Sequence, residues 1–255
     1  MKQATRLDRC WASSLGTCSS KISREHYVSK AFFSGPAVSV QGFQWCKTEP
    51  KIVSLASATA KILCKKHNSA LSPLDTEAAN YMQVVREHLL LSKARSRPRF
   101  TAFHVRYFNV NAKLLERWLL KVLINLCFDS EMLIGLDGEL AGKPPQSLVE
   151  ICFGDAAFQG KAGMYVASFN GMSMDMGEML KFSPLVRSDN RTIGGLYTVA
   201  GVNFFLSLDP LGPPPNFSEV PGIDDQWLNA QLQGRFREIK TEIGHCLSHV
   251  IRFKW

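Results

Sequence analysis

The sequence has no apolar stretch long enough to cross a bilayer, and its start, MKQATRLDRC, has no apolar signal core. It also lacks the dense cysteine spacing of a secreted disulfide framework, because only seven cysteines are spread over 255 residues. No internal repeat is evident, and no glycine pattern is typical of a phosphate loop. We therefore expect a cytoplasmic (intracellular) protein with reduced thiols and no membrane association.

Charge is distributed unevenly along the chain. Residues 1–100 carry sixteen Lys and Arg against six Asp and Glu, a net charge of +10, whereas residues 101–255 carry fourteen against sixteen. The break falls near the basic, proline-containing stretch KARSRPR (93–99), which predicts one domain over 1–98 and a second over 99–255. The basic part is expected to attract a polyanion, and we favour nucleic acid.

Periodicity predicts a mixed α+β protein. Apolar spacing predicts a helix over 73–92 with Ser72 as its N-cap, and a clearer helix over 111–128 capped by Asn111. His88 lies among polar neighbours on the first helix, so we expect it to be solvated. Residues 148–210, including VEICFG (149–154), favour an antiparallel sheet. The pattern of 224–255 leaves helix and strand open.

Two pairs of soft ligands lie within the first 67 residues. Cys64 and His67 have standard metal-ligand spacing, whereas Cys10 and Cys18 have seven residues between them and need an enlarged knuckle. Zinc takes four Cys or His ligands in tetrahedral geometry, commonly from two such pairs. Cys46 is an alternative ligand for one of the four positions.

A second group of residues lies around these pairs. Glu25 and His26 are adjacent, and Asn68 directly follows His67. A carboxylate and an amide oxygen suit a hard cation, whereas sulfur and imidazole suit zinc. An imidazole is suited to removing a proton near neutral pH.

The order Cys, Cys, Glu-His, Cys-x-x-His-Asn resembles the HNH, or ββα-metal, endonuclease superfamily over about residues 8–80. It is most similar to the variant in which Asn directly follows the last zinc ligand, as in zinc-stapled Holliday-junction resolvases of phages. The family commonly has Asp where this chain has Glu25, and more often Cys where it has His67. The long span between His26 and Cys64 indicates an insertion within the hairpin.

The resemblance implies an N-terminal ββα-metal or treble-clef zinc module, followed by an α+β domain with a mainly antiparallel sheet. It implies that His26 is the general base and that Glu25 and Asn68 bind Mg²⁺ or Mn²⁺. The implied ligands of a structural zinc ion are Cys10, Cys18, Cys64 and His67.

These features together predict a metal-dependent endonuclease that hydrolyses phosphodiester bonds in DNA, with RNA left open as a substrate. Phosphate contacts are expected from Arg24, Lys30, Lys65 and Lys66. The alternative is a non-catalytic zinc-finger protein that binds nucleic acid. In the endonuclease, residues 99–255 would serve targeting, homodimer formation or regulation through a partner.

Overall fold

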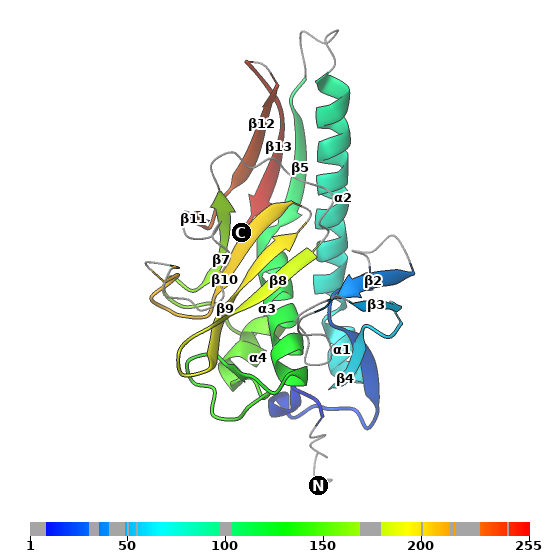
Figure 1. Cartoon of the computed structure of the whole chain (residues 1–255), viewed down its shortest axis with the longest axis vertical. Helices are drawn as coiled ribbons and strands as arrows, with labels where there is room; N and C mark the ends of the chain where they lie inside the picture. The colour runs from blue at the N-terminus through cyan, green and yellow to red at the C-terminus, as the bar shows by residue number, and fades with distance from the viewer. Residues whose placement is uncertain are drawn as a thin grey trace.

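The computed structural model describes residues 9–30, 36–40, 49, 51–54, 56–96, 104–168, 180–199, 201–214, 217, 230–243 and 245–255 (Figure 1). The α-helices are α1 (Lys65–Ala70), α2 (Ser72–Arg95), α3 (Ala112–Asp129) and α4 (Gln146–Phe153), and a 3₁₀ turn, η1, covers Ser13–Leu15. Helices and antiparallel-rich sheets are both present, as the α+β prediction requires.

Two short hairpins form the sheet structure of the N-terminal part. The first pairs β1 (Ile22–His26) with β4 (Thr59–Cys64), antiparallel, and the second pairs β2 (Ala37–Val40) with β3 (Lys51–Ser54). The chain passes from β4 into α1 without a loop, and α2 follows after one residue. This order sets α1 directly against the β1–β4 hairpin.

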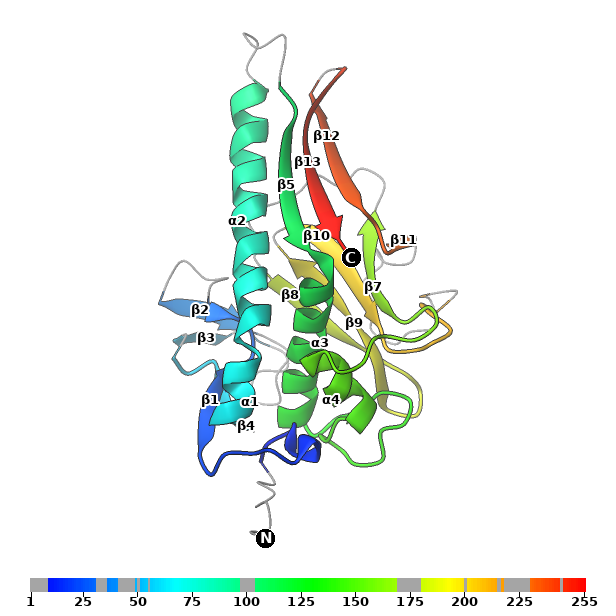
Figure 2. The same cartoon turned by 180° about the vertical axis from the view of Figure 1, so that it is seen from behind.

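The remaining strands form two larger sheets. The six-stranded sheet has the order β11–β7–β10–β9, and both β6 and β8 pair with β9; its strands are β6 (Leu133–Ile134), β7 (Gly163–Ser168), β8 (Leu180–Val186), β9 (Arg191–Val199), β10 (Val202–Ser207) and β11 (Gln231–Gly234). The three-stranded sheet consists of β12 (Glu238–Ile243), β13 (Cys246–Lys254) and β5 (Arg106–Asn111). Seen from behind, β5 runs between α2 and β13 (Figure 2).

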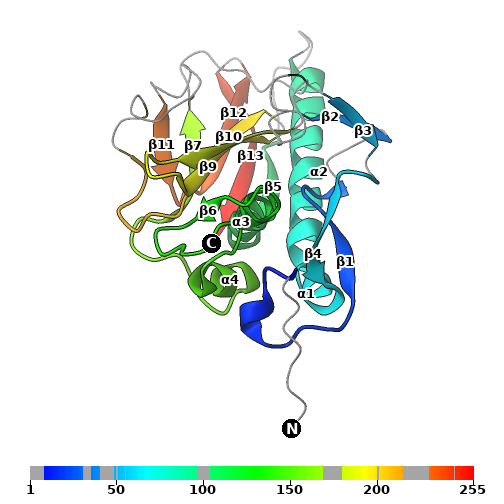
Figure 3. The same cartoon turned by 60° about the horizontal axis from the view of Figure 1, so that its bottom comes forward.

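Helix α3 joins the two parts of the fold. It contacts α2 and β4 on one side and β9 and β10 on the other (Figure 3). Residues 118–125 of α3 are all buried. One contiguous hydrophobic core runs from Trp11 through Trp118 to Phe253. The predicted boundary after residue 98 therefore separates segments that share a core, and whether 1–98 and 99–255 fold separately stays a prediction.

The sequence predictions for the two long helices are confirmed, with one local correction. Asn111 caps α3, because its Oδ1 accepts a hydrogen bond from Leu114 N at 3.2 Å. Ser72 is not an N-cap; it is the first residue of α2, and its hydroxyl donates to the Ser69 carbonyl at 2.8 Å. The chain is already helical at this point, because α1 leads straight into α2.

The strand prediction for residues 149–153 is wrong, because these residues belong to α4. The Pro145 carbonyl accepts from Leu148 N and Val149 N at the start of the helix. Gly154 ends it in a left-handed conformation, with φ of 92°. Helix end signals therefore outweigh the β-branched content of a short apolar run. From residue 230 on, the tail is made of strands.

His88 is buried, contrary to the prediction that it is solvated. Only 4% of it is exposed, because it continues the face of α2 formed by Leu74, Ala78, Tyr81 and Val85. Its ring stacks edge-on against that of His249, with centroids 4.3 Å apart, and its Nε2 lies 3.2 Å from Thr241 Oγ1. Burial lowers the pKa of His88 to about 4, and His249 adds to the effect.

This buried imidazole predicts acid sensitivity of the fold. The unfolded His88 has its ordinary pKa near 6.5, so between pH 6.5 and 4 the unfolded chain binds a proton that the folded chain does not. The contribution of neutral His88 to the free energy of unfolding should be fully present above pH 6.5. The free energy of unfolding should fall by at most about 3 kcal/mol as the pH drops toward 4. Urea unfolding at pH 7 and 4.5 should show a smaller loss for His88→Gln than for wild type. The exposed His245→Ala should keep the wild-type loss; equal losses in all three proteins would contradict the assignment.

Candidate metal centre

The junction between β4 and α1 presents one pair of ligands. Cys64 is the last residue of β4 and the N-cap of α1, and its sulfur accepts a hydrogen bond from His67 N at 3.5 Å. One helical turn separates the two residues, so their side chains lie on the same side of α1. Both are buried. The Cys64-x-x-His67 spacing therefore produces two converging ligands.

The second pair comes from the loop that precedes β1. Trp11 N donates to the Ile62 carbonyl at 3.0 Å, which fixes the Cys10 end of the loop to β4. The turn η1 and Gly16, in a left-handed conformation with φ of 73°, then reverse the chain toward Cys18. The seven-residue spacer is thus folded into an enlarged knuckle, as the spacing of the two cysteines predicted.

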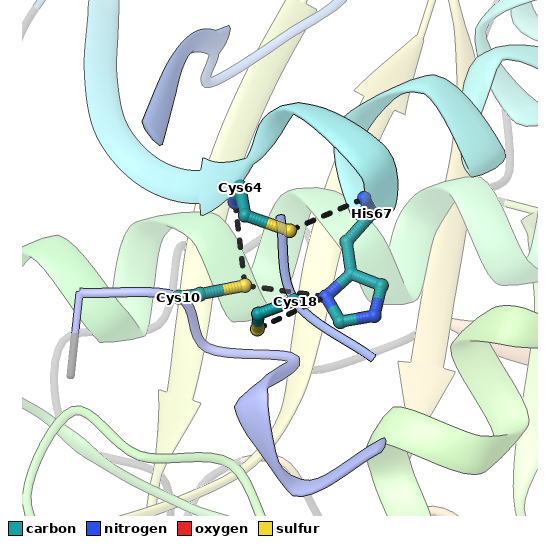
Figure 4. Close-up of side chains that lie close together, drawn as sticks. All are labelled: Cys10, Cys18, Cys64 and His67. Carbon is teal, nitrogen blue, oxygen red and sulfur yellow. Dashed lines mark hydrogen bonds between the residues drawn. The ribbon is translucent and has the colours of Figure 1, made fainter. Parts of the chain in front are cut away.

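The four predicted ligands meet in one place (Figure 4). Their sulfur and ring nitrogen atoms all lie within 4.8 Å of one another. The Nδ1 atom of His67 is 3.3 Å from Cys10 Sγ and 3.7 Å from Cys18 Sγ. A tetrahedral zinc ion, with bonds of about 2.3 Å to sulfur and 2.0–2.1 Å to nitrogen, holds its ligand atoms roughly 3.6–3.8 Å apart. The Cys₃His group can therefore bind a metal such as zinc. Cys46 lies outside the described residues.

The pKa shifts of the ligand side chains also favour a bound cation. Burial raises the pKa of Cys10 to about 12, and the neighbouring Cys18 and Cys64 add to the rise, so a thiolate there needs a positive partner. For Cys64 burial acts in the same direction, but N–H donors from His67 and Ser19 bring its pKa below the ordinary value. Burial and the Lys66 charge lower the pKa of His67, which keeps the ring neutral.

The outer nitrogen of His67 has a partner of its own. Its Nε2 lies 3.1 Å from Thr17 Oγ1, on the side away from the sulfurs. A metal at Nδ1 would leave the proton on Nε2, where the Thr17 hydroxyl can accept it. Such outer partners orient ligand imidazoles and fix their tautomer. Sequence reasoning did not identify Thr17 as a partner of the His67 ring.

The structure separates the predicted acid from the predicted base. Glu25 and His26 end β1 opposite Ala60 and Thr59, and consecutive strand residues point to opposite faces. Glu25 is 5% exposed, whereas His26 is half-buried. No hydrogen bond to the His26 ring occurs within the described part of the chain. Burial lowers the pKa of His26, and the charges of Lys30 and Lys121 lower it further. The Asp75 charge acts in the opposite direction without reversing the shift.

Asn68 lies against the strand that carries His26. Its amide nitrogen donates to Ser23 Oγ at 3.0 Å and approaches the Arg24 carbonyl at 3.5 Å. Its Oδ1 has no partner among the residues that the structure describes, which leaves an amide oxygen free for a cation. The hydrogen bonds bring Asn68 to β1, but none joins it to Glu25 or His26.

The Glu25 carboxylate is bound by a lysine of the second half of the chain. Lys121 Nζ is 2.5 Å from Glu25 Oε1 and 2.8 Å from Asp75 Oδ2, and the Lys121 side chain is 2% exposed. Sequence reasoning missed Lys121 and Asp75 as site residues. The available signal was a lysine in the middle of the apolar run LLKVLINL of α3.

Burial and charge act against each other within this group. Burial raises the pKa of Glu25, and the Lys121 charge only partly reverses the effect. Burial alone would lower the pKa of Lys121, but Glu25 and Asp75 raise it above its ordinary value. Lys121 is therefore charged, and it is the cation that the Glu25 carboxylate contacts.

The four predicted phosphate contacts lie on the surface. Arg24 and Lys30 flank the Glu25–His26 pair, and Lys65 and Lys66 form the first turn of α1; all four are exposed. Their position around the β1–α1 contact is compatible with a bound polyanion, and DNA as the partner stays a prediction.

Comparison with known proteins found no matching family model, curated protein or solved structure. Within the described ranges, no helix combines the length and apolar character needed to traverse a bilayer.

The cluster predicts one tightly bound zinc ion per chain. Elemental analysis of protein purified without added zinc should find it, and Cys64→Ser should lose it. The melting temperature of that variant should fall by about 20 °C or more, because zinc binding to such sites contributes about 10–16 kcal/mol in isolated peptides and each kcal/mol changes the melting temperature of a chain this long by about 2–4 °C. The matched control is Cys246→Ser, at an exposed thiol of β13, which should leave zinc content and melting unchanged. A metal-free wild-type protein that is fully folded would contradict the assignment.

Proposed function

We propose that the chain is a metal-dependent DNA endonuclease of the HNH, or ββα-metal, type. The observation that carries this proposal is the path of the chain around the Cys₃His group. The β1–β4 hairpin continues directly into α1, the acid–His pair ends β1, and Asn68 lies one turn into α1. This is the arrangement of strand, strand and helix that the resemblance implies.

His26 is the proposed general base. Its lowered pKa keeps the imidazole neutral near pH 7, so that a ring nitrogen can take a proton from the attacking water. The ring is half-buried and makes no hydrogen bond within the described residues, so it has no competing partner to give up. The exposed lysines of α1 would hold phosphates next to it.

Asn68 Oδ1 and the Glu25 carboxylate are the proposed ligands of Mg²⁺ or Mn²⁺. A bound ion would supply positive charge for the pentacovalent phosphorane and the leaving 3′-oxygen. Asn68 supports this role with its unpartnered oxygen. Glu25 supports it only when Lys121 gives up the carboxylate. The proposal includes an intracellular location, where nucleic acid substrates are found, and RNA remains open as a substrate.

The contact between Glu25 and Lys121 also favours a second candidate, the non-catalytic zinc-finger protein that binds nucleic acid. In that protein Glu25 would serve only to join the two halves of the chain. The two candidates differ in whether the protein cleaves nucleic acid, and the first also requires His26 for that cleavage.

Plasmid nicking decides between them. Wild type should nick DNA with Mg²⁺ or Mn²⁺ and not with EDTA, and His26→Ala should lower the rate by about 10²–10⁴-fold while keeping zinc and fold. His245→Ala, at an exposed histidine between β12 and β13, is the matched control and should stay fully active. Equal cleavage by wild type and His26→Ala would refute His26 as the base. No cleavage of duplex, single-stranded or branched DNA, or of RNA, would favour the binding protein.

The exposed lysines of α1 should supply part of the DNA affinity. In a His26→Ala background, Lys65→Gln with Lys66→Gln should weaken binding at 50 mM salt and lower the slope of log affinity against log salt by about 0.9 per lost phosphate contact. Fluorescence anisotropy over a salt series measures both quantities. Lys143→Gln with Lys161→Gln changes the same charge at exposed positions of the second half and should have little effect. A similar loss from both pairs would mean that binding is not localised at α1.

A further inference from the structure

One face of α3 carries polar side chains that contact the segment following β1. Residues 118, 121, 125 and 129 are three or four positions apart and so lie on one side of the helix. Trp118 Nε1 donates to Ser29 Oγ at 2.8 Å, and Asp129 Oδ2 accepts from the Tyr27 hydroxyl at 2.6 Å. Asn125 reaches the His26 carbonyl at 3.4 Å. The second half of the chain therefore binds the proposed base at its carbonyl and two of the residues that follow it.

Lys121 lies at the centre of this face, and its ammonium group joins two carboxylates. Its Nζ is 2.5 Å from Glu25 Oε1 and lies 2.9 and 2.8 Å from the two oxygens of Asp75. Ser29 also donates to Asp75, which fixes that carboxylate. Two carboxylates that converge on one buried cation are also what a hard divalent ion needs in order to bind.

We propose that Lys121 and the divalent ion compete for Glu25, so that Lys121 holds the nuclease centre in a resting state and Asp75 is a further carboxylate available to the ion once Lys121 leaves. This inference rests on the proposed function, because only there does Glu25 act as an ion ligand. Both cations cannot occupy the same space: a divalent ion in contact with Glu25 Oε1 would overlap Lys121 Nζ or be repelled by its charge.

The rest of the α3 face allows Lys121 to leave without loss of the interface. The Asp129–Tyr27 hydrogen bond involves neither carboxylate that Lys121 binds, and the Trp118–Ser29 hydrogen bond is linked to Asp75 only through the Ser29 hydroxyl. They can hold the segment 27–29 against α3 while the lysine side chain changes rotamer. Asp75 is 34% exposed in its side chain, so solvent and ions can reach it.

Thermal unfolding of the full-length Lys121→Met variant tests this proposal without measuring cleavage. Without added ion the variant should melt below wild type, because the buried Glu25 carboxylate is left without a cation. Millimolar MnCl₂ should raise its melting temperature by about 5 °C, whereas wild type should shift by less than about 1 °C. Lys113→Met, at an exposed lysine on the same helix, should behave as wild type.

The double variant Lys121→Met, Glu25→Gln separates ion binding from simple destabilisation. It has no unpaired buried charge at Glu25, so its melting temperature should recover, and its response to MnCl₂ should disappear. If the single variant does not fold, electron paramagnetic resonance titration of wild type decides, and micromolar Mn²⁺ affinity that Glu25→Gln abolishes would overturn the competition. An equal MnCl₂ response of wild type and Lys121→Met, or none in either, would also overturn it.

Failure of the proposed competition between Lys121 and the ion can be distinguished from failure of the proposed nuclease function. Metal-dependent nicking that needs His26, with no MnCl₂ response of Lys121→Met, would leave the nuclease in place and refute the competition. A MnCl₂ response of Lys121→Met, with no cleavage by either wild type or Lys121→Met, would support ion binding at Glu25 and refute the nuclease.

Discussion

Three thiols and an imidazole share one largely buried space where β4 meets α1, and without a cation they would offer one another only weak sulfur contacts. A metal ion in that space would join the loop before β1 to the start of α1. The cluster thereby fixes the first turn of α1, which carries Asn68, against the strand that ends in Glu25 and His26. This junction places Asn68, whereas Glu25 and the His26 carbonyl are also held by Lys121 and Asn125 of α3.

The second half of the chain extends that arrangement through α3. Its inner face is anchored in the six-stranded sheet, where the Tyr197 hydroxyl donates to the Leu119 carbonyl at 2.8 Å. Its polar face reaches the segment around His26, and Trp11, next to Cys10, donates to Asn125 at 3.0 Å. A displacement of α3 would therefore be felt at both the Cys₃His group and the acid–His pair. These contacts join α3 to both the Cys₃His group and the segment around His26.

Local features of the sequence predicted much of this arrangement. The Asn111 cap, the apolar spacing of α3 and the paired ligands depend on residues a few positions apart, and all four ligands converge as their spacing indicated. Long-range contacts were not accessible in this way. Lys121, the ion-pair partner of Glu25, is 96 positions away along the chain, and Asp75, which shares Lys121, is 50 positions away, so no local pattern links either to Glu25. The burial of His88 was missed because polar neighbours obscured its place on the apolar face of α2.

Two kinds of cation site are proposed. One is formed by sulfur and imidazole ligands, and the other by oxygen ligands beside a histidine. Anomalous diffraction from crystals of the full-length Lys121→Met variant, grown with excess Mn²⁺, tests this division most directly. The account predicts a zinc peak between Cys10, Cys18, Cys64 and His67 and a manganese peak in contact with Asn68 Oδ1 and Glu25. Zinc missing from the first position, or manganese missing from the second at saturating concentration, would contradict it.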